Sequence, residues 1–273
     1  MSEEFSLRTY LRDIQPPFCA GCGAFTVMNT FLRAVHEMGH KDLRGFAFCS
    51  GIGCSSWIPS PHFKADTIHV THGRSIPVAT GVKLMRPDLN VVVFGGDGDI
   101  VGIGLSHLIH AARRNVDITV VMVNNMIYGM TGGQVAPTTP FKLPTTTTPY
   151  GNFERALDAS KLIASAGACY VARWTTTHVS QLKESFKTAV NTKGFAFIEV
   201  ISQCPTAFGR RVGFKDAGEM LQWFKANSVT VEEANKLTEE ELQNKIVVGE
   251  FVKKEAPSLT ETVYAVLKEA QKK

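Results

Sequence analysis

The sequence predicts an α/β protein with a doubly wound, mainly parallel sheet of about six strands. Six β-rich runs are separated by helical or loop segments, which is the order expected of a parallel sheet with crossover helices. The runs are continuously apolar rather than alternating, and this pattern is typical of strands covered on both faces. We expect strands over residues 46–49, 67–70, 91–94, 118–123, 168–172 and 195–201.

Helices are expected over residues 23–37, 75–85, 102–114, 153–166 and 179–192. The last one illustrates the pattern, because its apolar side chains share one helical face and Gly194 follows as a stop signal. Residues 136–149 are rich in Pro and Thr, with too many breakers for a helix and too few apolar residues for a core strand. We expect this segment to be a loop, ordered over the functional site.

Residues 1–215 are expected to form one α/β domain and residues 216–273 a C-terminal extension. The composition of the extension shifts toward Glu, Lys and Asn. It should contain a short helix over residues 217–225 and a second helix that starts at a Thr-x-x-Glu box, Thr230 to Glu233. We expect it to pack on a partner chain or over the cysteine-rich region.

Composition excludes several classes of function. The chain has 273 residues, of which 44% are hydrophobic and 20% charged, and this suits one large α/β core with a tail. A net charge of +4 without a basic stripe gives no reason to predict nucleic-acid binding. The apolar runs are strand-sized, and the acidic start Met1-Ser2-Glu3-Glu4 is unlike a signal peptide, so we predict no membrane association and a cytoplasmic location.

Polar side chains follow two of the predicted strands at the point where each strand ends. Gly95-Gly96-Asp97-Gly98-Asp99 follows one run and Asn124-Asn125 follows the next, with Asn125 lying 28 residues after Asp97. This interval is long enough for a crossover helix between parallel strands, whose carboxyl ends share one crevice. A carboxylate, an amide and close-approaching glycine backbone suit Mg²⁺ and a diphosphate.

Cysteine usage is the second informative feature. Six cysteines in a chain of predicted cytoplasmic location favour a metal or redox role over disulfides. Cys19-x-x-Cys22 alone fits zinc, dithiol and iron–sulfur chemistry, while Cys54 and Cys204 follow β-rich runs and can reach the same sheet edge. Four thiolates suffice for one [4Fe–4S] cluster, and zinc is nearly as compatible with these residues. Two further cysteines lie inside apolar runs and are expected to be buried thiols, Cys49 and Cys169.

The spacing from Gly-Asp-Gly to Asn-Asn resembles the signature of thiamine diphosphate enzymes. From about Pro16 to about Lys215 the chain resembles β subunits of 2-oxoacid:ferredoxin oxidoreductases, most closely the 2-oxoglutarate branch. The motifs that carry this resemblance occur in the family's order: Cys19-Ala20-Gly21-Cys22-Gly23, Ser50-Gly51-Ile52-Gly53-Cys54-Ser55, His72-Gly73-Arg74, Tyr128-Gly129-Met130-Thr131-Gly132-Gly133-Gln134 and Cys204-Pro205.

The resemblance implies three ligand sets. Mg²⁺ would be held by Asp97, Asn125 and the main-chain carbonyl of Ile127, and one [4Fe–4S] cluster by Cys19, Cys22, Cys54 and Cys204. His72 and Arg74 would act on cofactor or substrate. The thiamine diphosphate contacts would be Ile52, Gly53, Cys54, Ser55, His72, Gly96, Gly98, Asp99, Asn125, Gly129, Met130 and Thr131.

The implied activity is coenzyme A-dependent oxidative decarboxylation of a 2-oxoacid, with electrons passing through the cluster to ferredoxin. In this family the Glu that activates thiamine comes from an α subunit, so we expect an αβ or (αβ)₂ assembly. The favoured substrate is 2-oxoglutarate, with pyruvate and branched-chain 2-oxoacids as alternatives. Some relatives have a Lys where this chain has Gly132, and that Lys can pair with the distal carboxylate of the substrate. Because this chain lacks it, we expect Arg74, Lys64 or the partner to recognise the distal carboxylate. A thiamine decarboxylase without redox function and a zinc-ribbon interaction protein remain alternatives from other classes.

Overall fold

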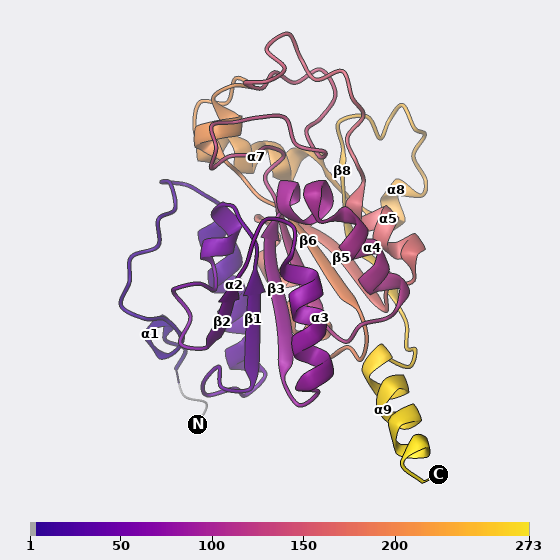
Figure 1. Cartoon of the computed structure of the whole chain (residues 1–273). Coiled ribbons are helices and arrows are strands. Elements are labelled where there is room, and N and C mark those ends of the chain that lie inside the picture. The colour runs from indigo at the N-terminus through magenta and orange to yellow at the C-terminus, as the bar shows by residue number, and fades with distance from the viewer. Residues whose placement is uncertain (1–3, 273) are drawn as a thin grey trace.

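The computed structural model describes residues 4–272, so most of the acidic start, Met1 to Glu3, lies outside the described residues. Within the described part the chain forms an eight-stranded sheet in the order β2-β1-β3-β4-β6-β5-β8-β7 (Figure 1). All six predicted strands are present, and they pair in parallel. Their bounds are β1 Phe46–Ser50, β2 Asp66–His69, β3 Asn90–Gly96, β4 Thr119–Asn124, β5 Tyr170–Thr175 and β6 Ala196–Ile201. The predicted doubly wound, mainly parallel α/β fold is confirmed.

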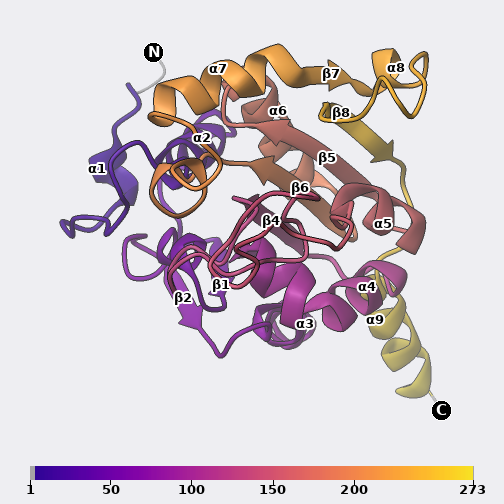
Figure 2. The same cartoon turned by 90° about the horizontal axis from the view of Figure 1, so that it is seen from above.

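Helices cover both faces of this sheet (Figure 2). One face carries α2 (Ala24–Glu37) and α6 (Val179–Asn191), and the other carries α3 (Ser75–Met85), α4 (Leu105–Arg113) and α5 (Ala159–Ala166). Successive strand residues enter opposite cores: Phe46 and Phe48 pack in one and Ala47 and Cys49 in the other. This double burial explains why the strand sequences are continuously apolar. Strand β2 is the exception, because it lies at the sheet edge and is largely exposed.

Two predicted helices begin later than expected. The segment after β3 first forms one stretch of π-helix, η2 (Gly98–Ile103), so α4 starts only at Leu105. Helix α5 starts at Ala159 rather than at residue 153, because Asp158 is its N-cap and accepts a hydrogen bond from the backbone N–H of Lys161. The residues before this cap continue the Pro- and Thr-rich loop.

The C-terminal extension adds two strands that the sequence patterns did not reveal. Strand β8 (Ile246–Lys253) pairs antiparallel with β5, and β7 (Ser228–Thr230) pairs parallel with β8. The count of about six strands was therefore too low. Helix α8 (Val231–Ala234) begins at the predicted capping box of Thr230 and Glu233. Helix α9 (Leu259–Ala270) extends away from the body of the molecule (Figure 1).

Helix α7 (Ala217–Asn227) lies over the carboxyl ends of the strands and forms a third, smaller core. Its Met220 and Phe224 pack with Met126, Ile127 and the π-helical turn η3 (Pro205–Gly209). The start of α7 also touches the first cysteine motif, since a Cβ added at Gly21 would lie 2.6 Å from the Cβ of Ala217. The remaining short helices are α1 (Leu7–Tyr10) and the 3₁₀ helix η1 (Cys54–Trp57). No helix in residues 4–272 has the length and apolar character needed to cross a bilayer.

The strand order creates an opening at one end of the sheet. After β1 the chain continues to β2 on one side, whereas after β3 it continues to β4 on the other side. The segments that leave β1 and β3 therefore diverge, and ligands of open α/β sheets bind at the carboxyl ends of strands at such a switch point. The turns after β1, β3 and β4 carry the predicted Mg²⁺ ligands and most of the predicted thiamine diphosphate contacts.

Candidate functional site

The turn after β3 places a buried carboxylate at the switch point. Asp97 is the N-cap of η2 and is only 2% exposed. The hydroxyl of Thr138 donates to its Oδ2, which ties the Pro- and Thr-rich loop to the site. Burial raises the pKa of Asp97 to about 7, partly offset by that hydrogen bond. A nearby cation would stabilise the charged form, so the residues present fit a bound metal ion.

The turn after β4 is held from behind by a second buried carboxylate. The amide Nδ2 of Asn124 donates to Glu199 Oε1 over 2.8 Å, which leaves Asn124 Oδ1 to accept from the backbone N–H of Met126. Met126 has a φ of 64°, which is unusual for a residue with a long side chain. Thr139 donates to the Met126 carbonyl over 2.6 Å. These contacts fix the orientation of Asn125 and of the Ile127 carbonyl.

A hollow of about 70 Å³ opens between these turns. All twelve residues predicted to contact thiamine diphosphate line it, and so do Asp97 and Ile127. The structure thus gathers at one place residues that come from the segments after β1, β2, β3 and β4. Its remaining lining residue is Tyr128, which lies in the motif from Tyr128 to Gln134 but was not among the predicted site residues.

Tyr128 gives Gly98 a specific physical role. Its hydroxyl donates to the Gly98 carbonyl over 3.1 Å, and a Cβ added at Gly98 would lie 2.2 Å from the Tyr128 ring. Glycine is therefore required here by the packing of the tyrosine, in addition to any close approach of a diphosphate to the backbone. Only long-range packing reveals this contact, since the two residues are 30 positions apart.

A second cavity, of about 320 Å³, holds the four cysteines predicted to bind iron. Cys19, Cys22, Cys54 and Cys204 all line it, and Cys54 also lines the smaller hollow beside Asp97. The two cavities therefore share a wall. A backbone hydrogen bond from Gly23 N–H to the Gln203 carbonyl, 3.1 Å long, draws the first cysteine motif to the end of β6.

Burial raises the pKa of three of these thiols and so favours their protonated form in the protein alone. It raises the pKa of Cys22 to about 12 and that of Cys54 to about 11, and it also raises the pKa of Cys204. Within residues 4–272 no three or more His, Cys, Asp or Glu side chains converge as on a single metal ion. A cubane cluster binds each thiolate at a different iron atom, so four thiols around a roomy cavity fit the cluster without converging on one point.

His72 and Arg74 lie in different environments in the structure. His72 lines the smaller hollow, and its Nδ1–H donates to Asp99 over 2.5 Å. Arg74 is exposed, is not among the residues that line either cavity and contributes to lowering the pKa of His107 on α4, after the larger effect of burial. Lys64 also lies outside both linings and donates to the Arg8 carbonyl over 2.6 Å. Neither cation lines the hollow.

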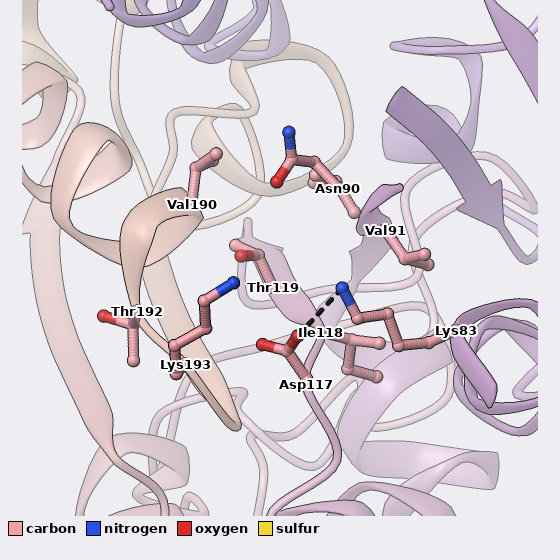
Figure 3. A pocket seen from close by; sticks show the side chains of 10 residues that line it. Lys83, Asn90, Val91, Asp117, Ile118, Thr119, Val190, Thr192 and Lys193 are labelled. Carbon is pink, nitrogen blue, oxygen red and sulfur yellow. Dashed lines mark ion pairs between the residues drawn. The ribbon is translucent and has the colours of Figure 1, made fainter. Parts of the chain in front are cut away.

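The opposite, amino end of the sheet has a small polar hollow of different character (Figure 3). Lys83, 5% exposed, pairs with Asp117 over 2.8 Å and donates to the carbonyls of Pro87 and Leu89. The hollow measures about 20 Å³, which is space for roughly one water molecule. This cluster joins α3 to the segments before β3 and β4, and within it the charges of Lys83 and Asp117 neutralise each other.

Fold and site together define a class. Residues 51–200 match the family model described as "Thiamine pyrophosphate enzyme, C-terminal TPP binding domain", thiamine pyrophosphate being another name for thiamine diphosphate. This stretch contains the turns after β1, β3 and β4 that line the smaller hollow.

Individual proteins that match most of the chain identify the family within this class. The chain is 50% identical over 260 residues to the 2-oxoglutarate synthase subunit KorB of Methanocaldococcus jannaschii, covering 94% of this chain and 96% of that one. It is 44% identical over 189 residues to the 2-oxoacid:ferredoxin oxidoreductase 2 subunit beta of Aeropyrum pernix, covering 69% and 60% respectively. The solved 2-oxoglutarate:ferredoxin oxidoreductase from Magnetococcus marinus, with 2-oxoglutarate, coenzyme A and succinyl-CoA bound, superposes with a TM-score of 0.87 at 33% identity, covering 98% of this chain and 92% of that one. The chain belongs to the β subunits of 2-oxoacid:ferredoxin oxidoreductases.

Proposed function

We propose that this chain is the β subunit of an enzyme that converts 2-oxoglutarate and coenzyme A to succinyl-CoA and CO₂ and passes two electrons to ferredoxin. The observation that carries the proposal is the wall shared by the two cavities. Cys54 lines both the hollow beside Asp97 and the cavity that holds the other three cysteines. A site for bond breaking and a site for electron exit would thus be separated by one turn of the chain.

Separate sets of residues would hold the metal ion, the diphosphate and the cluster. Asp97, Asn125 and the Ile127 carbonyl would hold Mg²⁺, and the backbone around Gly96 and Gly98 would face the diphosphate. The thiols of Cys19, Cys22, Cys54 and Cys204 would hold one [4Fe–4S] cluster. When bound, thiamine diphosphate supplies an electron sink for decarboxylation and the cluster supplies one-electron transfer. The protein orients both groups and keeps them close together.

The site requires a second chain. A hollow of about 70 Å³ is far smaller than the roughly 300–1,000 Å³ of a typical cofactor pocket, so part of the enclosure must come from elsewhere. Among the residues that line it there is no Glu to activate the aminopyrimidine ring. We assign both the missing walls and this Glu to an α subunit, in an αβ or (αβ)₂ assembly, and place the enzyme in the cytoplasm.

We divide the chain into a cofactor-binding part and a C-terminal extension according to where the proposed ligands lie. Residues 1–215 contain every proposed ligand, whereas residues 216–273 contribute α7 next to the first cysteine motif and β8 at the sheet edge. We assign the extension to supporting the cluster region. Since neither Arg74 nor Lys64 lines the hollow, recognition of the distal carboxylate falls to the partner.

Anaerobic co-expression with an α-type chain tests the proposal. We expect iron near four atoms per chain, bound thiamine diphosphate and Mg²⁺, and dye reduction that needs both 2-oxoglutarate and coenzyme A. A colourless, iron-free protein that still binds thiamine would favour a decarboxylase without redox function. Zinc without thiamine would favour an interaction protein, and a preference for pyruvate or branched-chain 2-oxoacids would overturn the substrate assignment.

A further inference from the structure

Asp99 is a buried carboxylate whose surroundings are built from glycines. It lies in η2 and is 2% exposed. A Cβ added at Gly51 would lie 2.2 Å from Asp99 Oδ2, and one added at Gly95 would lie 2.9 Å from the same atom. Side chains at these two positions would occupy the volume of the carboxylate. Two glycines of the strand-end motifs thus make room for Asp99 itself.

One oxygen of this carboxylate holds three chain segments together. Oδ1 accepts from the backbone N–H of Gly73 over 2.7 Å, from the backbone N–H of Ile52 over 3.2 Å and from His72 Nδ1 over 2.5 Å. Oδ2 is buried and has no hydrogen-bond partner within the described residues. Asp99 lines the hollow, but its Oδ1 is fully engaged by these three donors, so contact of that oxygen with a cofactor would require these bonds to break.

The pairing fixes the chemistry of His72. A carboxylate oxygen can only accept, so Nδ1 carries the hydrogen, and in the neutral form of such a ring Nε2 is the acceptor. The His72 side chain is 33% exposed and lines the hollow, and its ring lies 6.1 Å from the ring of Tyr128. The remaining nitrogen is the part of the ring that is available to a molecule bound there.

We propose that Asp99 is a positioning residue that acts through His72, and that His72 Nε2 is a hydrogen-bond acceptor for a hydroxyl or amino group of the molecule bound in the hollow. This rests on the proposed function, because the molecule in the hollow is taken to be the cofactor or its substrate adduct. In this proposal Asp99 has a positioning role and His72 has a defined tautomer.

The competing account is that Asp99 only clamps the turns after β1, β2 and β3. His72→Asn separates the two, because the Asn amide can still donate to Asp99 from the place of Nδ1 while the acceptor at Nε2 is gone. If the pair is only a clamp, this variant keeps normal turnover. If our proposal holds, kcat falls by about 100-fold, as for loss of a positioned acid–base group, while KM, iron and thiamine content stay within twofold.

Asp99→Asn and the double variant complete the test, all in the co-expressed complex. Asp99→Asn should lower kcat by about 10-fold, and Asp99→Asn/His72→Asn should be no slower than His72→Asn alone, since residues that act as a unit are not additive. Independent, multiplied losses would overturn the proposal, as would normal turnover of His72→Asn. His107→Asn on α4, outside the hollow, is the matched control and should leave turnover unchanged.

A readout without turnover uses diethyl pyrocarbonate and peptide mass spectrometry. In the wild-type complex without substrate, His72 should be carbethoxylated at its free Nε2, and Asp99→Asn should slow this several-fold relative to His107. Equal rates in both proteins would overturn the assigned tautomer. If the wild-type complex lacks thiamine or iron, the proposed function fails, but the labelling comparison still decides whether Asp99 orients His72.

Discussion

Replacement of Glu199 by Gln should destabilise the turn after β4, because Glu199 on β6 accepts a hydrogen bond from Asn124 at the end of β4. Glu199 lies on β6, is 2% exposed, and accepts from Arg173 Nε over 2.7 Å and from the Ser160 hydroxyl over 2.6 Å, in addition to its bond with Asn124. A Gln side chain keeps the size but loses the charge, and one end of its amide can only donate. Either Arg173 or Asn124 then loses its acceptor in the buried network.

The expected size of the effect follows from this burial. Removing one partner of a buried ion pair costs about 3–5 kcal/mol, and we take the lower end because Arg173 keeps its pairing with Asp158. For a chain of this size each kcal/mol lowers Tm by roughly 2–4 °C, so the expected loss is about 6–12 °C. Because Asn124 also fixes Met126, metal affinity should fall by about 10-fold.

Thermal unfolding by circular dichroism and Mg²⁺–thiamine diphosphate titration of the purified protein check these two effects. Glu184→Gln on α6 is the control, because this 63% exposed side chain pairs with Lys187 on the surface and should have no measurable influence. A Tm within about 2 °C of wild type for Glu199→Gln would refute the reasoning, since surface changes alone reach that size. A large Tm loss with unchanged metal affinity would refute the link through Asn124.

Three further changes test separate parts of the structure. Thr138→Val removes the hydroxyl that holds Asp97 and should weaken Mg²⁺ binding by about 10-fold in calorimetry, with Tm nearly unchanged. Gly53→Ala forces a φ of 138° on a residue with a Cβ and should lower iron content and thiamine affinity together, while Gly81→Ala inside α3, where a Cβ meets nothing within 4 Å, should not. Lys83→Met removes the ion pair of the partly buried Asp117 carboxylate, which keeps only its hydrogen bond from the Gly194 N–H, and should destabilise the protein by about 3 kcal/mol in denaturant unfolding, without changing iron or thiamine content (Figure 3).

Local patterns were sufficient to predict the framework. Continuous apolar runs located five of the six predicted strands, and a β-rich but largely exposed run located the edge strand β2. The placement of Asp97 and Asn125 after two of these strands predicted that they would line one hollow. These predictions succeed because period and strand polarity are properties of short segments. The Thr230 capping box succeeded for the same reason, since both partners lie within four residues.

Contacts between distant segments were not predictable. The hydrogen bond of Thr138 to Asp97 spans 41 residues, and the pairing of His72 with Asp99 spans 27. No periodicity marks either contact, because each depends on how a loop folds back over the sheet. Strand β8 was missed for a related reason: Gly249 interrupts it, and its pairing with β5 at residue 170 onward depends on tertiary contacts. The choice of iron over zinc likewise came from the family resemblance.

The turn from Gly51 to Ser55 is where the two halves of the site meet, and its construction explains why neither half can shift alone. The backbone N–H of Ile52 donates to Asp99, and Gly53 has a φ of 138°, a conformation that favours glycine. Cys54 lines both cavities. A displacement of this turn would move a proposed cluster ligand and a wall of the proposed cofactor hollow by the same amount. Since electron transfer between two groups depends on their separation, a short turn anchored at both ends would preserve that separation better than two independent loops would. The glycines that accommodate Asp99, which binds this turn through Ile52, would therefore help to keep the proposed cofactor and cluster at a constant distance.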